Sequence, residues 1–319
     1  MAELGVAVVF PGQGSQQPGM GKSLAEAFPE SAAVFDEVST VVGRDLRQVC
    51  WEMDADTLRQ TQNAQIALFT ASLAAYRALQ SRVGAKPLVG AGHSVGEFAA
   101  LAASGVLSLA DAARLVQRRG DLMARAGNLA PGTMAAVLGA DDDAVERVCQ
   151  ECSTDDEPVV PANYNSPGQI VISGAVAAVE RACERIKEEG AKRCVILNVS
   201  GAFHSPLMAA AAESFGEAVG SLPLNSGDFP VVSNVTGEPV ETPEEWRSLV
   251  VRQLSSPVRW TKCVHSMSKA GARVFLELGA GSVLCGLIKR TLDDAVAVPF
   301  EKPEDLEAVR SALTAEVGA

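Results

Sequence analysis

The sequence predicts an α/β fold built on a parallel sheet, and two observations predict it. Short apolar runs that suit buried strands alternate with longer, alanine-rich runs that suit helices. This alternation is typical of parallel strands joined by crossover helices. Near the middle of the chain the pattern changes to the order β-α-β-β-α-β. We therefore expect a larger α/β body with a smaller unit inserted into it.

The larger body begins with alternating strands and helices. A buried strand over residues 6–10 ends in a glycine-rich turn, and a second strand over residues 87–91 breaks at Gly92. A helix follows that break, and Ser108 with Asp111 caps the next one. We expect the helices of this half over residues 24–42, 64–81, 95–104 and 108–125.

The inserted unit is predicted to occupy residues 130–199. Its two middle strands are separated by Asn165-Ser166-Pro167-Gly168, which is a turn-like composition at hairpin distance. The order strand, helix, strand, strand, helix, strand is that of ferredoxin-like folds. The strands are expected over residues 133–138, 159–163, 169–174 and 193–199, and the helices over residues 142–151 and 177–190.

The larger body resumes after the insertion, so its two parts, residues 1–129 and 200–319, are discontinuous in sequence. The same alternation of patterns predicts the remaining elements. We expect helices over residues 206–221, 242–253 and 259–270, and strands over residues 231–233 and 273–277.

Composition and charge exclude several classes of protein. The 319 residues are 47% hydrophobic and 21% charged, which suits an ordinary globular chain and argues against disorder. No apolar stretch reaches the roughly 20 residues that cross a membrane. A net charge of −12 should repel nucleic acid and anionic membranes. No secretory signal precedes the first strand. We expect a monomer that binds neither nucleic acid nor membrane. Its expected location is the cytoplasm, or an organelle such as a plastid or mitochondrion if a transit peptide was removed.

Seven cysteines are spread thinly along the chain. Disulfide frameworks belong to smaller and denser secreted chains, so we expect reduced thiols. Cys149 and Cys152 form a C-x-x-C within a helical pattern, but no second pair or nearby histidine completes the four ligands that zinc needs. We expect no metal site.

Gly92-His93-Ser94-Val95-Gly96 is the one G-x-S-x-G of the sequence, and it lies between a predicted strand and a predicted helix. This context is typical of a nucleophile elbow, in which glycines on both sides allow a tight turn that projects the serine outward. The amide of Val95 would then point toward an oxyanion formed beside Ser94. A glycine-rich turn with a serine cap is the alternative. We predict that Ser94 is a nucleophile.

A serine nucleophile needs a base, and the sequence offers three histidines. His93 adjoins Ser94, so its side chain is expected to point away, and His265 lies in a predicted helix, where a structural role is expected. His204 follows the strand over residues 193–199, at the strand end where α/β proteins place their sites. His204 is therefore the candidate base. No acid for a third catalytic position can be singled out.

Two further segments carry polar groups that could serve this site. The turn after the first strand lacks the third glycine of a dinucleotide loop and the G-K-[ST] of a phosphate loop. We therefore expect Gln13 in this turn to offer its amide to the site. Arg118 and Arg119 lie on a predicted helix. Arg118 is expected on a solvated face, whereas an arginine beside the serine would bind a planar carboxylate with two hydrogen bonds.

Six short segments together resemble malonyl-CoA:acyl carrier protein transacylases, the acyltransferases that load fatty-acid and polyketide synthesis. Their order and separations match the family over nearly the whole chain. The segments are FPGQGSQ at residues 10–16, GHSVGE at 92–97, QRRG at 117–120, NYNSPGQ at 163–169, GAFHSP at 201–206 and RQL at 252–254.

The resemblance implies a fold and a reaction. The larger subdomain, residues 1–129 and 200–319, would be α/β-hydrolase-like, beside the ferredoxin-like subdomain of residues 130–199. The reaction would be ping-pong transfer of a malonyl group through an acyl-serine, from malonyl-CoA to the phosphopantetheine thiol of acyl carrier protein. No cofactor beyond these two substrates is implied.

The resemblance also assigns catalytic roles. Ser94 resembles the acylated nucleophile and His204 its general base. The amides of Gln13 and Val95 match the oxyanion-hole positions. Gln253 matches the residue whose backbone carbonyl orients the histidine, in place of an aspartate.

Further matches concern the acyl group and the carrier protein. Arg119 matches the arginine that binds the free malonyl carboxylate and so discriminates against acetyl-CoA. Gln65 matches a glutamine of the acyl pocket, Asn163 a residue beside the site, and Phe203 the phenylalanine of malonyl-selective members. Four basic residues match positions around the entrance, where an acidic carrier protein would dock: Lys192, Arg193, Lys289 and Arg290.

Three alternatives stay open. A serine esterase or thioesterase could use the same elbow, with an acid between the serine and the histidine in the chain and no buried arginine facing the serine. A carrier-protein docking module could keep the fold without catalysis. A stand-alone, trans-acting polyketide synthase acyltransferase would share each catalytic residue and differ in its carrier protein.

Overall fold

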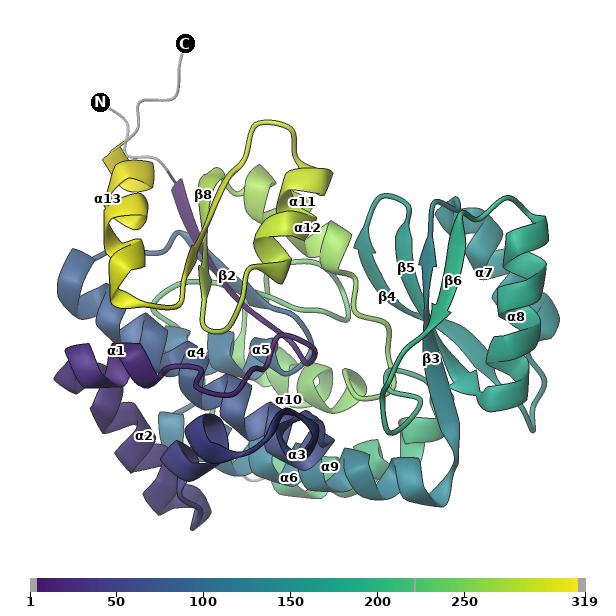
Figure 1. Ribbon diagram of the computed structural model, residues 1–319, viewed down its shortest axis with the longest axis horizontal. Helices are drawn as coiled ribbons and strands as arrows, with labels where there is room; N and C mark the ends of the chain where they lie inside the picture. Colours follow the sequence, from purple (N-terminus) through teal and green to yellow (C-terminus); the bar gives the residue numbers. More distant parts are fainter. Residues whose placement is uncertain (1–4, 221, 315–319) are drawn as a thin grey trace.

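The computed structural model describes residues 5–220 and 222–314 of the chain. The chain forms two lobes (Figure 1), which contain a five-stranded parallel sheet and a separate four-stranded antiparallel sheet. The predicted fold class is therefore confirmed. The predicted ranges include residues 1–4, 221 and 315–319, which lie outside the described residues. The division of the chain into subdomains at residues 130 and 199 stays a prediction.

The larger sheet contains β1 (Gly5–Phe10), β2 (Val89–Gly92), β7 (Val231–Val232), β8 (Ala272–Leu278) and β9 (Val296–Phe300). Its strand order is β7-β2-β1-β8-β9, and each pair of neighbours is parallel. Side chains of β1 alternate between two apolar clusters, with Val8 in one and Val9 in the other. Burial on both faces explains why this strand is a continuous apolar run in the sequence.

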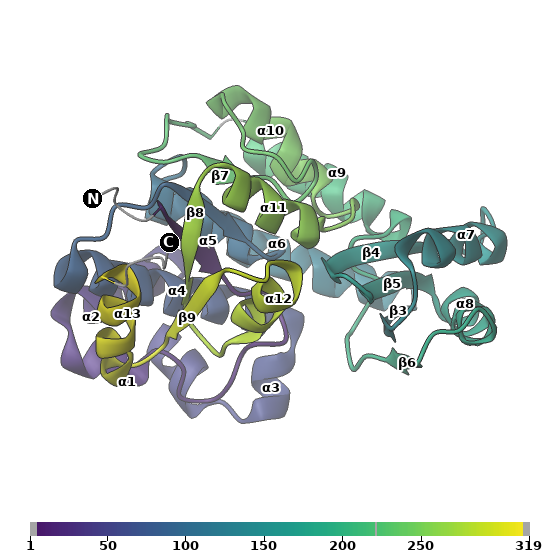
Figure 2. The same cartoon turned by 90° about the horizontal axis from the view of Figure 1, so that it is seen from above.

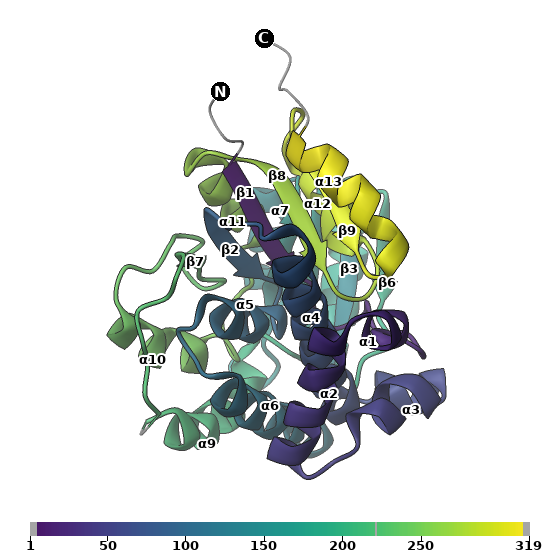
Figure 3. The ribbon, with the colours of Figure 1, turned by 90° about the vertical axis from the view of Figure 1, so that its left-hand side faces the viewer.

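Helices cover both faces of the larger sheet. α4 (Thr61–Val83), α5 (Gly96–Ser104) and α6 (Leu109–Leu129) belong to the cluster of Val8, below the strands in Figure 3. α11 (Trp260–Lys269) and α12 (Val283–Thr291) belong to the cluster of Val9. The other helices of this lobe are α1 (Lys22–Ala27), α2 (Pro29–Val42), α3 (Ala55–Arg59), α9 (Ala209–Val219), α10 (Pro243–Arg252) and α13 (Leu306–Thr314), with a π-helical turn at Gln48–Glu52 and 3-10 turns at Pro206–Met208 and Pro303–Asp305. No helix in the described ranges is both long enough and apolar enough for a membrane span.

The single helix predicted over residues 24–42 is wrong. The chain forms α1 and α2 instead, with Phe28 in extended backbone between them (φ −130°, ψ 114°). Pro29 is the first residue of α2. Proline suits the first turn of a helix but disfavours helical backbone at the residue before it. The break therefore follows from Pro29.

The C-terminal part contains elements that the sequence patterns do not predict. No element is expected beyond residue 277, yet α12, β9 and α13 follow there. β9 pairs with β8 at the edge of the sheet and contains Pro299. Proline is tolerated in an edge strand, because one side of the strand needs no ladder hydrogen bonds. A short strand with an internal proline therefore escapes pattern analysis.

The smaller sheet contains β3 (Gly132–Leu138), β4 (Val159–Ser166), β5 (Gln169–Ala175) and β6 (Arg193–Ile196). Its order β4-β5-β3-β6, with antiparallel neighbours, is the predicted ferredoxin-like arrangement. α7 (Asp142–Cys152) and α8 (Val176–Glu188) pack on one face, at the outer side of this lobe in Figure 2. β6 ends three residues earlier than expected, so residues 197–199 continue as a loop.

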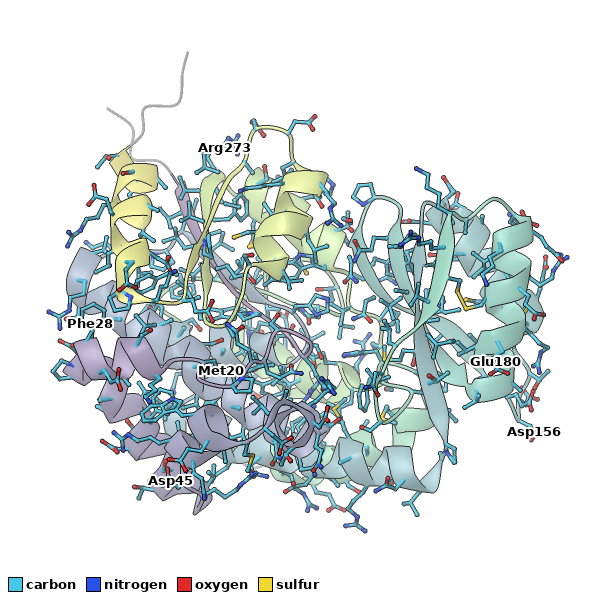
Figure 4. The ribbon with its side chains drawn as sticks, viewed as in Figure 1. Met20, Phe28, Asp45, Asp156, Glu180 and Arg273 are labelled. Atoms are coloured by element: carbon cyan, nitrogen blue, oxygen red, sulfur yellow. A yellow bond between two sulfur atoms is a disulfide. The ribbon has the colours of Figure 1, made fainter. Side chains whose placement is uncertain are left out.

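Cys183 and Cys194 form a disulfide between α8 and β6, visible as a yellow bond in the right-hand lobe of Figure 4. The expectation of reduced thiols is therefore wrong for this pair. The helix packs against the strand and brings the two Cα atoms to 5.6 Å, within the usual range for a disulfide. Their spacing of eleven residues in the sequence does not reveal this proximity. The free cysteines are Cys50, Cys149, Cys152, Cys263 and Cys285.

Candidate active site

Ser94 lies in a sharp turn between β2 and α5. Its φ is +52°, in the left-handed region that residues with a side chain seldom adopt. Both flanking positions need glycine, because neither has room for a side chain. A Cβ at Gly92 would lie 1.9 Å from the carbonyl carbon of Gly96, and a Cβ at Gly96 would lie 2.1 Å from the carbonyl oxygen of Phe10. The turn therefore has the geometry of a nucleophile elbow.

His204 approaches Ser94 from the loop before Pro206–Met208. Its Nε2 lies 2.7 Å from Oγ of Ser94, and its Nδ1 lies 2.8 Å from the backbone oxygen of Gln253 and 3.2 Å from that of Ser256. Carbonyl oxygens only accept hydrogen bonds, so Nδ1 carries the proton and Nε2 accepts the O–H of Ser94. The imidazole is thus oriented by two carbonyls and not by an acid.

The backbone at His204 is also left-handed, with φ of +58°. Within residues 5–220 and 222–314, Ser94 and His204 are the only non-glycine residues with positive φ. Backbone strain of this kind gathers at functional sites. The pKa of His204 is lowered to about 3, mainly by burial and secondly by the positive charge of Arg119. The imidazole is therefore neutral near pH 7, as a general base must be.

Two backbone amides beside Ser94 are available to an anion. Those of Gln13 and Val95 donate no backbone hydrogen bond within the part of the chain that the structure describes. Gln13 follows β1 and Val95 follows β2, and the two strands are neighbours in the sheet. The loop of Gln13 packs closely on the elbow, since a Cβ at Gly12 would lie 2.6 Å from the backbone oxygen of His93. Such paired N–H groups are suited to an oxyanion.

Arg119 lies on α6 and is completely buried. Its Nη1 donates to Oε1 of Gln65 (2.6 Å), and its Nη2 donates to Oγ of Ser94 (3.1 Å) and Oε1 of Gln253 (2.9 Å). Nε has no hydrogen-bond partner among the described residues, so the guanidinium keeps donor capacity that these contacts do not use. Burial lowers the pKa of Arg119 to about 10, which leaves the guanidinium charged near pH 7. Arg118 is exposed, as predicted.

A buried network of Glu97, Asn234 and Gln253 supports the elbow. Asn234 accepts a hydrogen bond from the backbone N–H of Ser94 (2.8 Å) and donates to the backbone oxygen of Gly92 (2.7 Å). The backbone N–H of Asn234 and Nε2 of Gln253 donate to the two carboxyl oxygens of Glu97, at 2.6 and 2.5 Å. Sequence reasoning missed Glu97 and Asn234. Two features of the sequence could have pointed to them. Glu97 comes directly after the G-x-S-x-G, and Asn234 comes two residues after β7, a strand of the same sheet as β2.

Ser94 opens into a cavity of about 430 Å³ between the two sheets. The strands of the smaller sheet form the opposite wall through residues such as Met134 and Val171. Five predicted site residues line the cavity: Gln13, Ser94, Asn163, Phe203 and His204. Four others are buried behind this lining: Gln65, Val95, Arg119 and Gln253. The structure therefore brings these nine residues to one place.

The other two histidines are used differently. His93 lines the cavity, but its Nε2 lies 2.9 Å from Oδ1 of Asn165 and its ring packs on Trp260, with 5.7 Å between centroids. His265 is exposed on α11. His204 is therefore the histidine that contacts the hydroxyl of Ser94.

The basic residues expected at the entrance are exposed and do not line the cavity: Lys192, Arg193, Lys289 and Arg290. Arg290 contacts the lining, because its Nη1 donates to Oε1 of Gln169 (2.6 Å), and Gln169 is part of the lining. Arg193 begins β6, and the loop after that strand reaches the cavity through Leu197.

No group of three or more His, Cys, Asp or Glu side chains placed to hold a metal ion is found in residues 5–220 and 222–314. Cys149 of the C-x-x-C is buried on α7, and burial raises the pKa of its thiol to about 12. A protonated thiol is a poor metal ligand.

Comparison with known proteins agrees with this geometry. The sequence matches the acyl transferase domain family over residues 7–314. It is 40% identical to the malonyl CoA-acyl carrier protein transacylase of Bacillus subtilis, over 98% of both chains. The structure resembles the crystal structure of malonyl-CoA:acyl carrier protein transacylase from Xanthomonas oryzae, with a TM-score of 0.93, 43% identity and coverage of 98% of this chain and 99% of that one. It also resembles a malonyl-transacylase solved with its type II PKS acyl-carrier protein, with a TM-score of 0.92, 40% identity and coverage of 97% and 99%. The chain belongs to the acyl transferase family.

Proposed function

We propose that the protein transfers the malonyl group of malonyl-CoA to the phosphopantetheine thiol of acyl carrier protein, and so supplies fatty-acid synthesis. One observation carries the proposal: the hydroxyl of Ser94 contacts both Nε2 of His204 (2.7 Å) and Nη2 of the buried Arg119 (3.1 Å). A base activates the nucleophile, and a cation next to it suits an acyl group that carries a carboxylate. The names of the relatives support the same reaction.

The first half-reaction forms an acyl-serine. Nε2 of His204 takes the proton of Ser94 as Oγ bonds to the thioester carbon of malonyl-CoA. The carbonyl oxygen becomes an oxyanion that the amides of Gln13 and Val95 bind, and one such donor is worth about 3 kcal/mol in other serine enzymes. The oxyanion then collapses, the carbon–sulfur bond breaks, and the CoA sulfur leaves with the proton from His204.

The second half-reaction reverses these roles. The thiol of the carrier protein gives its proton to His204 and attacks the malonyl-serine. Ser94 leaves with that proton, and the malonyl thioester of the carrier protein is released. The backbone carbonyl of Gln253 stabilises the imidazolium formed in each half, since Nδ1 donates to it at 2.8 Å.

Arg119 selects the acyl group in this proposal. Its spare N–H donors bind the malonyl carboxylate, and Gln65 holds the guanidinium from the other side at 2.6 Å. Asn163 and Phe203 line the cavity, where the bulk of Phe203 limits substituents on the malonyl carbon. Acetyl-CoA would leave the buried cation without an anion, which is costly.

Partner and compartment belong to the same proposal. The protein has a net charge of −12, so an acidic carrier protein needs a local positive surface, which Lys192, Arg193, Lys289 and Arg290 would supply. We infer a cytoplasmic monomer that needs no cofactor beyond its two substrates.

A second candidate is a trans-acting polyketide synthase acyltransferase. A specific observation favours it, because one similar structure is a malonyl-transacylase in complex with its type II PKS acyl-carrier protein. A serine thioesterase is less well supported, since carbonyl groups and not an acid face Nδ1 of His204.

The test is a transfer assay read by intact mass. The protein is mixed with malonyl-CoA and then with holo- or apo-carrier protein from a fatty-acid synthase or a type II polyketide synthase. We expect one malonyl group on the enzyme and its transfer to a holo-carrier only. Hydrolysis of malonyl-CoA without transfer would contradict the proposal, and the preferred carrier decides between the two pathways.

A further inference from the structure

Glu97 is a buried acid directly beneath the nucleophile. In the described parts of the chain only Glu97 and Glu277 are acidic residues with no exposed surface. Glu277 accepts hydrogen bonds from the backbone N–H groups of Leu284 and Cys285, at the start of α12. Glu97 lies in the first turn of α5, three residues after Ser94. The proposed mechanism gives Glu97 no part.

Both carboxyl oxygens of Glu97 face donors. Oε1 accepts from the backbone N–H of Asn234 at 2.6 Å, and Oε2 accepts from Nε2 of Gln253 at 2.5 Å. An ionised carboxyl group only accepts hydrogen bonds. The NH₂ end of Gln253 therefore points toward Glu97 and toward the backbone oxygen of Ser94, to which Nε2 also donates at 3.0 Å. The oxygen end of the same amide points away from both acceptors.

The oxygen end of Gln253 faces Arg119. Oε1 accepts from Nη2 at 2.9 Å, and the same Nη2 donates to Oγ of Ser94 at 3.1 Å. If the amide of Gln253 were reversed, an NH₂ group would oppose the guanidinium, and Nη2 of Arg119 would keep only Oγ of Ser94 as an acceptor. Gln65 holds the guanidinium through Nη1, and the orientation of the Gln253 amide decides whether the Nη2 end beside the serine is held as well.

Charge supports this arrangement. Arg119 is completely buried, and no carboxylate lies within ion-pair distance of it in the part of the chain that the structure describes. Glu97 is joined to it through the single amide of Gln253. The two opposite charges favour each other across this amide, although burial raises the pKa of Glu97 to about 7.

We propose that Glu97 is a positioning residue for acyl-group selection, because it fixes the side-chain amide of Gln253 and thereby holds Arg119 where the malonyl carboxylate binds. The inference rests on the proposed function. It predicts an effect on the choice between malonyl and acetyl groups that a loss of folded protein cannot produce.

The central variant is Glu97→Gln. The introduced amide has one oxygen for two facing donors, so one pairing is lost whichever way the amide turns. We expect kcat/KM for acylation by malonyl-CoA to fall about tenfold to a hundredfold, as for a lost hydrogen bond to a charged group, and that for acetyl-CoA to fall less. The malonyl-to-acetyl ratio should therefore fall roughly tenfold.

The matched control is Glu277→Gln, which removes the other buried carboxylate with two N–H donors. Glu277 makes no hydrogen bond with Ser94, Arg119 or Gln253. We therefore expect this variant to change kcat/KM for malonyl-CoA and for acetyl-CoA by the same factor. An equal loss for both groups in Glu97→Gln as well would overturn the proposal and leave a structural role only.

A second variant keeps the test decisive if Glu97→Gln does not fold. The double variant Glu97→Gln with Gln253→Glu exchanges the donor and the acceptor between these two side chains, and again places a carboxyl oxygen opposite Arg119. It loses the 3.0 Å hydrogen bond from Gln253 to the backbone oxygen of Ser94. We expect its malonyl-to-acetyl ratio to stay within roughly tenfold of the unmodified protein. A folded double variant without malonyl preference would refute the inference. Failure of the proposed function looks different, since the unmodified protein would then form no malonyl-enzyme at all.

Discussion

The two walls of the cavity are built differently. On the side of the larger sheet, Ser94, His204 and Arg119 are linked by hydrogen bonds of 2.7 and 3.1 Å and held by a buried network beneath. On the side of the smaller sheet, β3, β5 and the loop after β6 contribute mostly apolar side chains such as Met134 and Leu197, and β4 adds Asn163 and Asn165. Directional bonds fix the first wall, whereas dispersion and burial shape the apolar part of the second. Substitutions should therefore have large and specific effects on the first wall and small, general effects on the second.

The largest effect is expected for Ser94→Ala, which should abolish the malonyl-enzyme because no other nucleophile lies at the elbow. Intact mass spectrometry after mixing with malonyl-CoA measures the adduct. The control is Ser166→Ala on β4, a buried serine whose Oγ has no hydrogen-bond partner among the described residues. A malonyl adduct on Ser94→Ala would contradict the assignment of the nucleophile.

The next effect is expected for His204→Ala. Removal of a general base slows proton transfer, so acylation should be about 10²–10⁴-fold slower while the fold is kept. Stopped-flow or quenched-flow kinetics under single-turnover conditions measure this rate. The control is His265→Ala, which changes an exposed histidine on α11. An unchanged rate would point to another base.

Arg119→Ala should affect one substrate more than another. Loss of the charged hydrogen bonds to the malonyl carboxylate should lower kcat/KM for malonyl-CoA about tenfold to a hundredfold, with a smaller loss for acetyl-CoA. Arg118→Ala, which changes the exposed neighbour, should leave both values close to those of the unmodified protein. Equal losses for malonyl- and acetyl-CoA would remove the carboxylate role of Arg119.

Leu197→Ala tests the wall on the side of the smaller sheet. It removes apolar contact area without a directional bond, so kcat/KM for malonyl-CoA should fall only about two- to fivefold. Val195→Ala on the same segment, where the side chain is exposed, is the control. A loss as large as that of Arg119→Ala would break the contrast between the two walls.

The smallest effect concerns stability and pH. The unfolded chain protonates His204 near pH 6.5, whereas the folded protein holds its pKa at about 3. As pH falls below 6.5 the unfolded state therefore gains protons first, and the folded state loses stability until pH 3 is reached. Between pH 7.5 and 5.5 we expect the unmodified protein to lose about 1 kcal/mol more than His204→Gln does.

Urea unfolding at the two pH values measures this difference. The effect belongs to the larger lobe, because residues 130–199 contain no histidine. Equal losses for the two proteins would show that His204 is not buried in its neutral form.

Sequence reasoning predicted the two sheets and the serine turn because local chemistry specifies them. Strands and helices follow from local runs of residue types, and the serine turn follows from Gly92 and Gly96, where the structure has no room for a side chain. The proximity of Cys183 and Cys194 could not be predicted, because it depends on how a helix packs against a strand. The contacts of Glu97 and Asn234 escaped for the same reason, since they join residues about 140 positions apart.

The backbone at Ser94 and His204 has a consequence beyond geometry. Both residues occupy conformations that glycine adopts freely and other residues adopt at a cost. A glycine would relax the chain at either place and at the same time delete the reacting group. Thermal robustness and turnover therefore oppose each other at these two positions, and a screen that rewards heat resistance alone would select inactive protein.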